Sequence, residues 1–289
     1  MRMVTKNYPL LNGCGRLANL PLVRHVVDAI HPDEIEVTLR NGLYINSPAC
    51  DFVGRALLLF GDLDPKITKI AQSILRPGDT VLDIGAHVGL FSMYASEMVG
   101  KNGSVHAFEP QANLVQRFER TIEHNQISNV TLHPFALGDA TKIAKMHIPA
   151  GNSGAASLIR KKTSGITTPV GVFHASEFLD RQNIATPRMI KIDVEGYESA
   201  VIRGLIKFIL ARMPAAIVFE AQFQQSRNNN AAISILEEVG YRCHPILPSA
   251  LQLRIGPAGK TENHKGVHDI LAVAPGILGN EILSLCNDR

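Results

Sequence analysis

The sequence has no tryptophan, only four cysteines and almost no excess of charge. The cysteines Cys14, Cys50, Cys243 and Cys286 are widely scattered, with no C-x-x-C pair and no histidine at metal-ligand spacing. This spacing disfavours a zinc site and predicts a reduced, cytoplasmic location. The net charge of +3 comes from 29 basic and 26 acidic residues, which is too small an excess to indicate a nucleic-acid groove. We therefore expect no nucleic-acid partner.

Long apolar runs are also missing. No stretch approaches the ~20 residues that a membrane-spanning helix needs, and the N-terminus lacks a continuous apolar signal-peptide core. The chain has 289 residues, of which 45% are hydrophobic and 19% charged, as is typical of globular enzymes. We expect a soluble protein without a transmembrane segment, and the oligomeric state stays open.

The chain divides into an N-terminal extension, residues 1–60, and a catalytic domain, residues 61–289. Within the extension, apolar and polar residues alternate over 35–45 around Asn41-Gly42, a pair typical of a two-residue turn. The extension is therefore predicted to carry a β-hairpin.

From Thr80 onward, apolar β-rich segments alternate with helical patterns, which favours a parallel sheet covered on both faces. The last two apolar stretches, 241–247 and 269–274, have no convincing helix between them and are expected to form an antiparallel closing pair. Residues 140–180 break the rhythm and are rich in Gly, Ser, Thr and Lys. We interpret them as an insertion over the active site that contains a small hairpin. The five earlier strands are predicted at 80–84, 104–108, 130–135, 189–193 and 216–220.

A glycine loop joins the first of these strands to a helix. Gly85 and Gly89 allow backbone to approach a ligand closely, and the helix start offers free N–H groups. A nicotinamide enzyme would show G-x-G-x-x-G, whereas His87 occupies the middle position here and Asp83 precedes the first glycine. A tight turn without a ligand is disfavoured, because a buried Asp83 would need polar partners. The loop is predicted to bind a nucleotide-like cofactor other than NAD.

Acidic residues follow two further strands. Glu109 ends the second strand, where a carboxylate can accept both hydroxyls of a ribose. Asp193, Glu195 and Glu198 follow the fourth strand, at the edge where ligand-contacting groups of open α/β sheets collect. The simpler alternative for Glu195 and Glu198 is that they favour the amino end of the next helix.

Together these motifs resemble those of the FkbM-family methyltransferases over roughly half the chain, from Thr80 to Glu220. The resemblance implies a class I methyltransferase fold, which is a Rossmann-like α/β fold with a mainly parallel seven-stranded sheet and an antiparallel last strand. It implies S-adenosylmethionine as the cofactor and O-methylation of a sugar, glycan, polyketide or related hydroxylated metabolite. The motif series is Asp83 to Gly89, Phe108-Glu109-Pro110, Ala136-Leu137-Gly138-Asp139, Ser157-Leu158 and Ile190 to Glu198. The cofactor-binding residues predicted from it are Asp83, Gly85, Ala86, His87, Gly89, Glu109, Pro110, Ala136, Leu137 and Asp139.

Catalysis is assigned to Asp193 and Glu195, with Asp193 as the leading general base for an alcohol acceptor. A Mg²⁺ ion held by Asp193 and Glu220 is an alternative that we do not favour. Ser157 and Arg160 are predicted to contact the acceptor from a loop over 151–165. Two other classes stay open, namely a nicotinamide-dependent oxidoreductase and a catalytically silent cofactor-binding module.

Overall fold

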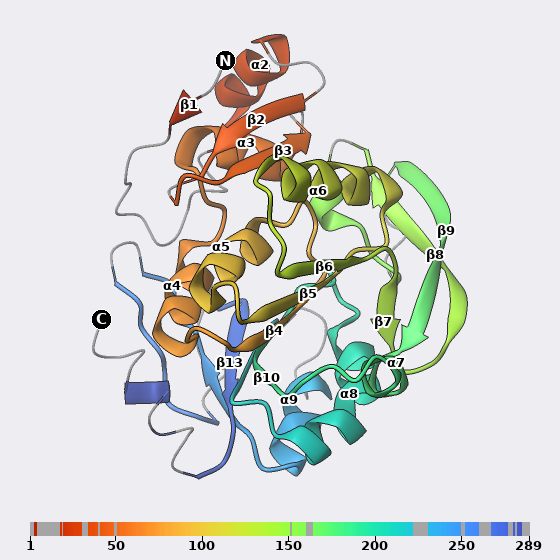
Figure 1. Cartoon of the computed structure of the whole chain (residues 1–289). Helices are drawn as coiled ribbons and strands as arrows, with labels where there is room; N and C mark the ends of the chain where they lie inside the picture. Colours follow the sequence, from red (N-terminus) through yellow and green to blue (C-terminus); the bar gives the residue numbers. More distant parts are fainter. Residues whose placement is uncertain are drawn as a thin grey trace.

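A seven-stranded sheet forms the centre of the computed structural model (Figure 1). Its strand order is β12-β13-β11-β10-β4-β5-β6, and β13 runs antiparallel to both of its neighbours while the remaining pairs are parallel. This arrangement confirms the predicted class I methyltransferase fold, including its reversed last strand. The strands are β4 (Thr80–Ile84), β5 (Ser104–Phe108), β6 (Val130–His133), β10 (Pro187–Ile192), β11 (Ala216–Glu220), β12 (Arg242–Pro245) and β13 (Asp269–Val273). The structure describes residues 3–4, 18, 20–30, 34–39, 41–48, 51–150, 152–159, 164–221, 231–249, 252–259, 267–276, 280 and 282–284.

Helices cover both faces of this sheet, and alternate strand residues belong to two different hydrophobic clusters. Val81 and Met189 pack with α4, α5 and α6 on one face, whereas Leu82 and Ile190 pack with α7, α8 and α9 on the other. Strands buried on both faces are almost continuously apolar, which is why they could be found from composition. The helices are α4 (Pro65–Ile74), α5 (Leu90–Val99), α6 (Ala112–His124), α7 (Ala175–Arg181), α8 (Glu198–Arg212) and α9 (Ala231–Glu238).

The N-terminal region contains the predicted hairpin and two helices that were not predicted. The Leu39 backbone N–H donates to the Leu43 carbonyl at 2.7 Å, so the strands stay paired up to these two residues and the connection is longer than the predicted two-residue turn at Asn41-Gly42. Gly42 takes the left-handed conformation with φ +83°, which suits glycine at the end of such a turn. The elements are β1 (Met3–Val4), α2 (Pro21–Ile30), β2 (Glu34–Thr38), β3 (Tyr44–Pro48) and α3 (Phe52–Phe60).

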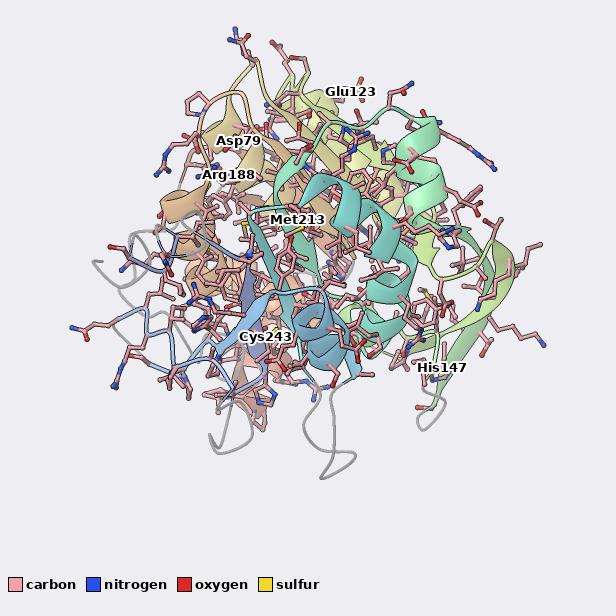
Figure 2. All side chains as sticks on the ribbon, turned by 90° about the horizontal axis from the view of Figure 1, so that it is seen from below. Asp79, Glu123, His147, Arg188, Met213 and Cys243 are labelled. Atoms are coloured by element: carbon pink, nitrogen blue, oxygen red, sulfur yellow. The ribbon has the colours of Figure 1, made fainter. Side chains whose placement is uncertain are left out.

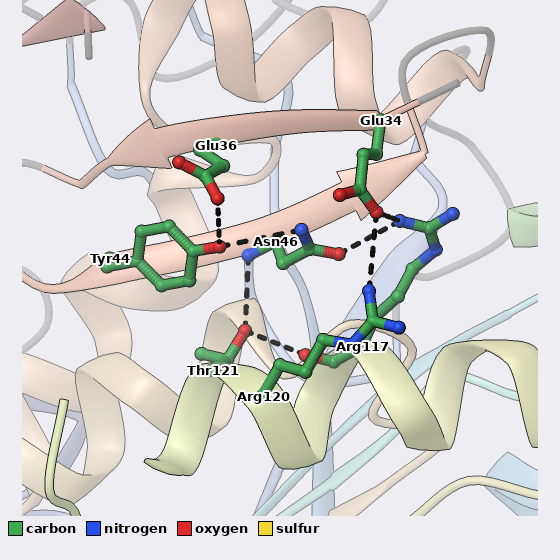
Figure 3. A network of polar contacts seen from close by, with 7 residues as sticks. All are labelled: Glu34, Glu36, Tyr44, Asn46, Arg117, Arg120 and Thr121. Carbon is green, nitrogen blue, oxygen red and sulfur yellow. Dashed lines mark hydrogen bonds and ion pairs between the residues drawn. The ribbon is translucent and has the colours of Figure 1, made fainter. Parts of the chain in front are cut away.

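The hairpin is attached to the catalytic core through α6, by the polar contacts that Figure 3 shows. The Thr121 hydroxyl oxygen accepts the backbone N–H of Asn46 at 3.1 Å. Arg117 donates to both Asn46 and Glu34 at 2.9 Å. Asn46 is 1% exposed and Thr121 is fully buried, so the contact between them lies inside the structure, whereas the contact of Arg117 with Glu34 is exposed. The described part of residues 1–60 thus shares its packing with the core.

The insertion forms a three-stranded sheet beside the main one (Figure 1). β8 and β9 make the predicted antiparallel hairpin, and β9 also pairs with β7 in parallel. The predicted third strand of the main sheet ends earlier than expected, at His133, because the chain turns there into β7. The elements are β7 (Ala136–Gly138), β8 (Lys142–Pro149), the 3₁₀ turn η1 (Ser153–Ala155) and β9 (Gly165–His174).

Figure 2 shows Asp79 and Arg188 near the amino ends of β4 and β10, away from His147 on β8. Cys243 lies in β12 as a buried free thiol, while the other cysteines fall outside the described residues. Within the described ranges, none of the helices combines the length and apolar character required to cross a bilayer. The cytoplasmic location stays a prediction.

Candidate functional site

A cavity of about 370 Å³ opens where β4, β5 and β10 end, at the carboxyl edge of the sheet. One wall comes from the N-terminal region and α4. It combines apolar and polar side chains, namely Phe52, Val53, Leu63 and Ile67 with Asp62, Asp64 and Thr68. The N-terminal extension therefore contributes to the site, which the sequence did not indicate. Nine of the predicted site residues line the cavity: Gly85, Ala86, His87, Glu109, Pro110, Ala136, Leu137, Asp193 and Glu195.

The glycine loop has the predicted position, but its two glycines are required by close contacts within the protein. Gly85 has φ +84°, and a Cβ there would run into the carbonyl oxygen of Asp193. Gly89 has φ +86°, and a Cβ there would overlap the ring of Phe118 on α6. We expected these glycines to leave room for a ligand. The structure shows that they let the loop pack against the segment after β10 and against α6.

Glu109 lies opposite this loop at the end of β5. Its two carboxylate oxygens accept the backbone N–H groups of His87 and Gln111, both at 2.9 Å. The side chain is 4% exposed, and burial raises the pKa of Glu109 to about 7. The Gln111 side chain also hydrogen-bonds this carboxylate. A carboxylate has about four lone-pair sites, so acceptor capacity remains for a hydroxyl group.

Asp83 is completely buried and does not line the cavity, contrary to its predicted direct contact with the cofactor. One carboxylate oxygen accepts the Ser92 hydroxyl at 2.6 Å, and the other lies 3.4 Å from Nζ of Lys191. Lys191 also lies 3.4 Å from Asp193. Burial alone would lower the pKa of Lys191, but the two carboxylates outweigh it and raise the pKa. Asp83 therefore acts on the site through Lys191.

Three carboxylates gather beyond Lys191. Ligand atoms of Asp193, Glu195 and Glu220 all lie within 4.8 Å of one another. Burial first, and then the charges of Asp193 and Glu195, raise the pKa of Glu220 to about 9. Glu198 has a different role, because its Oε1 accepts the backbone N–H groups of Val194 and Gly196 at 3.3 and 3.0 Å. Glu198 thus shapes the loop that carries Asp193 and Glu195.

Of the remaining predicted residues, Gly89, Asp139 and Ser157 do not line the cavity. Ser157 is 2% exposed and its hydroxyl donates to the Glu195 carbonyl at 2.8 Å, so it ties the insertion to the loop after β10. A direct contact of Ser157 with the acceptor is therefore not supported. Asp139 forms a 3.1 Å ion pair with Arg203 on α8, and its contact with the cofactor stays a prediction. Arg160 falls outside the described residues.

Sequence reasoning missed several polar residues that line the cavity, namely Lys191, Gln111, Asn152, Ser153, Asp62, Asp64 and Thr68. It also missed Asp51, which contacts Ser153. Lys191 had a local signal, because it alternates with buried residues inside β10 and precedes Asp193. Asp51 and Ser153 had none. They meet across 102 positions of the chain, through a 3.1 Å hydrogen bond from the Ser153 backbone N–H to the Asp51 carboxylate.

The strand order, the glycine loop and the strand-end acids define a class I methyltransferase fold with a cofactor-sized cavity. The methyltransferase FkbM domain matches residues 83–243, more than half of the chain, and the protein belongs to this family.

Three relatives match a shorter part. Methyltransferase 1 of Beauveria bassiana is 26% identical over 149 residues, covering 45% of this chain and 59% of that protein. The 31-O-demethyl-FK506 methyltransferase FkbM of Streptomyces tacrolimicus is 28% identical over 163 residues, covering 45% and 61%. The hexuronic acid methyltransferase AglP of Haloferax volcanii is 22% identical over 145 residues, covering 48% and 57%. The chain thus spans less than two thirds of the length of these relatives.

Proposed function

We propose that the protein is an S-adenosylmethionine-dependent methyltransferase whose acceptor is a hydroxyl group of a sugar, glycan or polyketide-like metabolite. The observation that carries this proposal is the arrangement of the glycine loop between two acids. His87 in the loop donates its backbone N–H to Glu109, and Gly85 packs against the Asp193 carbonyl. Glu109 is therefore available to the ribose of a cofactor, and Asp193 is available to an acceptor.

The polar groups of the cavity fit the cofactor. Glu109 keeps acceptor capacity for ribose hydroxyls, and the carbonyl oxygen of the Gln111 side chain is buried without a partner. Ala136 and Leu137 provide apolar wall beside Glu109. S-adenosylmethionine supplies a methyl group on a sulfonium, which is electrophilic enough to be displaced in line by an oxygen.

Asp193 is proposed to accept the proton of the acceptor hydroxyl. Its side chain is half exposed, and it lies at the end of β10 in the cavity wall, where an acceptor can reach it. A positioned base contributes about 10²- to 10⁴-fold, and holding two reactants in line contributes about 7 to 11 kcal/mol. Positioning of the reactants by the cavity walls is therefore expected to lower the reaction barrier more than the base does. Glu195 is a second candidate for the same proton.

A divalent cation is the alternative. The carboxylates of Asp193, Glu195 and Glu220 form an all-oxygen donor set that suits Mg²⁺, which would acidify a bound hydroxyl. We favour the base because the ammonium group of Lys191 already lies 3.4 Å from Asp193 and supplies a positive charge there.

The names of two relatives support a hydroxylated acceptor. One is named for 31-O-demethyl-FK506 and the other for hexuronic acid. A shorter match, 33% identical over 75 residues, is to a protein of Sorangium cellulosum named for ribosomal RNA. We propose a small-molecule or glycan acceptor because the first two matches span about twice as much of the chain.

Calorimetry with S-adenosylmethionine and with NAD tests the cofactor, and transfer of a labelled methyl group to neutral sugars, glycosides and hydroxylated polyketides tests the reaction. We expect binding of S-adenosylmethionine alone and a labelled ether as product. Binding of NAD with hydride transfer would establish the oxidoreductase instead. Cofactor binding without transfer to any acceptor would favour the silent module.

Asp193→Asn then separates the two mechanisms. If Asp193 is the base, turnover falls at least about 10²-fold with cofactor affinity near wild type, and EDTA has no effect. If the acids hold Mg²⁺, EDTA abolishes turnover, Mg²⁺ restores it, and Glu220→Gln is as damaging as Asp193→Asn. Wild-type turnover by Asp193→Asn contradicts both mechanisms.

A further inference from the structure

The cavity wall next to Glu109 is closed by segments from distant parts of the chain. Asp51 caps the amino end of α3, because its Oδ1 accepts the Val53 backbone N–H at 3.3 Å. Its Oδ2 accepts both the backbone N–H and the hydroxyl of Ser153 in η1. Asp51 is 2% exposed. This buried carboxylate therefore holds η1 against the start of α3.

Ser153 also contacts the glycine loop. Nε2 of His87 lies 2.9 Å from the Ser153 hydroxyl oxygen. Since the hydroxyl hydrogen goes to Asp51, that oxygen must accept a hydrogen from Nε2. Burial lowers the pKa of His87, so the ring is neutral at pH 7 and the hydrogen-bond network assigns its single proton to Nε2. Each hydrogen bond of this network therefore has a defined donor, and the network holds η1 against the glycine loop.

Gln111 completes this wall with an oxygen that has no partner. Its backbone N–H donates to Glu109, and its side-chain Nε2 donates to the Ser153 carbonyl at 3.2 Å. These contacts orient the amide, and among the described residues nothing donates to its Oε1. Gln111 is 4% exposed and lines the cavity. A buried acceptor left unpaired costs about 1 to 3 kcal/mol, so a ligand that brings a donor relieves this cost.

A second side-chain oxygen of this cavity also has no partner. Oδ1 of Asn152, the residue before η1, is buried without a partner in the described structure, and Asn152 lines the same cavity. With Glu109 and Gln111, the cavity wall thus carries three side chains with hydrogen-bond acceptors. A pair of hydroxyl groups, such as those of a ribose, is the complementary ligand.

We propose that Gln111 is a second ribose-binding residue, whose Oε1 accepts a hydrogen bond from a cofactor hydroxyl beside Glu109. Asp51 is the positioning residue for this contact, because it holds Ser153 and Ser153 holds the Gln111 amide. The inference rests on the proposed function, since the ligand is the S-adenosyl group. It gives the N-terminal region a defined part in cofactor binding.

Calorimetry with S-adenosylhomocysteine and its 2′-deoxy and 3′-deoxy forms tests the contact of Gln111. Gln111→Met keeps the side-chain volume and removes the oxygen. We expect it to weaken binding of S-adenosylhomocysteine about 3- to 10-fold, the range of one hydrogen bond. The loss should be much smaller for the deoxy ligand that lacks the contacted hydroxyl. Gln116→Met, at an exposed position of α6, is the matched control and should bind as the wild type does.

Asp51→Asn and Ser153→Ala test the positioning role. Asparagine keeps an oxygen for the α3 cap but replaces Oδ2 by an amide nitrogen that faces two donors. Each change should weaken S-adenosylhomocysteine binding and speed hydrogen exchange over 152–159, with Tm near the wild-type value. The double variant should bind S-adenosylhomocysteine no more weakly than the single variant with the lower affinity, because Asp51 and Ser153 act through the same chain of contacts.

The outcomes separate this inference from the proposed function. If the wild type does not bind S-adenosylhomocysteine, both are overturned. If the wild type binds but Gln111→Met binds equally well, or loses the same factor for all three ligands, only the ribose contact is overturned. Additive losses in the Asp51→Asn/Ser153→Ala variant, or unchanged exchange over 152–159, overturn the positioning role.

Discussion

Lys191→Met should destabilise the protein by about 3 to 5 kcal/mol, the cost of removing one partner from a buried ion pair. Asp83 has no exposed surface, and besides the Lys191 ammonium group its carboxylate contacts the Ser92 hydroxyl. Methionine fills a similar volume but leaves this carboxylate without its cation. The change is therefore electrostatic, with little loss of packing.

Urea unfolding followed by circular dichroism measures the effect. Lys207→Met, at an exposed position of α8, is the control and should stay within about 0.5 kcal/mol of wild type. The double variant Asp83→Asn/Lys191→Met should recover most of the loss, because both charges are then gone. A Lys191→Met protein within about 1 kcal/mol of wild type, or a double variant no more stable than the single one, would refute the reasoning.

Three further predictions concern cofactor binding. Glu109→Ala should weaken S-adenosylmethionine binding by about 1 to 3 kcal/mol in calorimetry, and unchanged affinity would remove Glu109 from the ribose site. Because burial raises the pKa of Glu109 to about 7, its carboxylate becomes protonated as pH falls from 8 to 6, so affinity should fall in that direction, and a flat profile would contradict this. Gly85→Val should abolish binding and lower the free energy of unfolding by more than the control Gly78→Val does. Both glycines have positive φ, which costs about 1 to 2 kcal/mol for a residue with a side chain. Of the two, only Gly85 faces the Asp193 carbonyl. Equal losses of stability in the two variants would show that this close approach is unimportant.

The central sheet was predictable because its strands are buried on both faces. β4 has five buried residues in a row, Thr80 to Ile84, and such runs stand out in composition alone. The acids at the ends of β5 and β10 follow from the same reasoning, since parallel strands carry their functional groups to one edge. The local sequence pattern therefore predicted both the fold and the acidic residues at the ends of its strands.

The two N-terminal helices were missed for different reasons. α3 is apolar nearly all around, with even Arg55 buried, so tertiary packing decides it and its sequence alone gives a weak signal. In α2 the apolar residues Leu22, Val23, Val26, Val27 and Ile30 do recur at helical spacing. That pattern was present in the sequence and was not recognised.

The contacts of the insertion were missed because they are nonlocal. Ser157 looked like an acceptor ligand in a polar loop, but its hydroxyl is used by the Glu195 carbonyl. Ser153 was not singled out, although it meets Asp51 and His87. Small polar residues in loops are chosen by their neighbours in space, and those neighbours come from segments far apart in the chain.

The position of β13 has a consequence for how the protein is made. β13 lies between β11 and β12, so an interior strand of the sheet is the last of its strands to be synthesised. Until Asp269–Val273 leaves the ribosome, β11 and β12 each present an unpaired edge, and such edges favour pairing with other chains. The sheet of the nascent protein therefore stays open between β11 and β12 until β13 is available. Any shortened version that stops before Asp269 should remain in that aggregation-prone form.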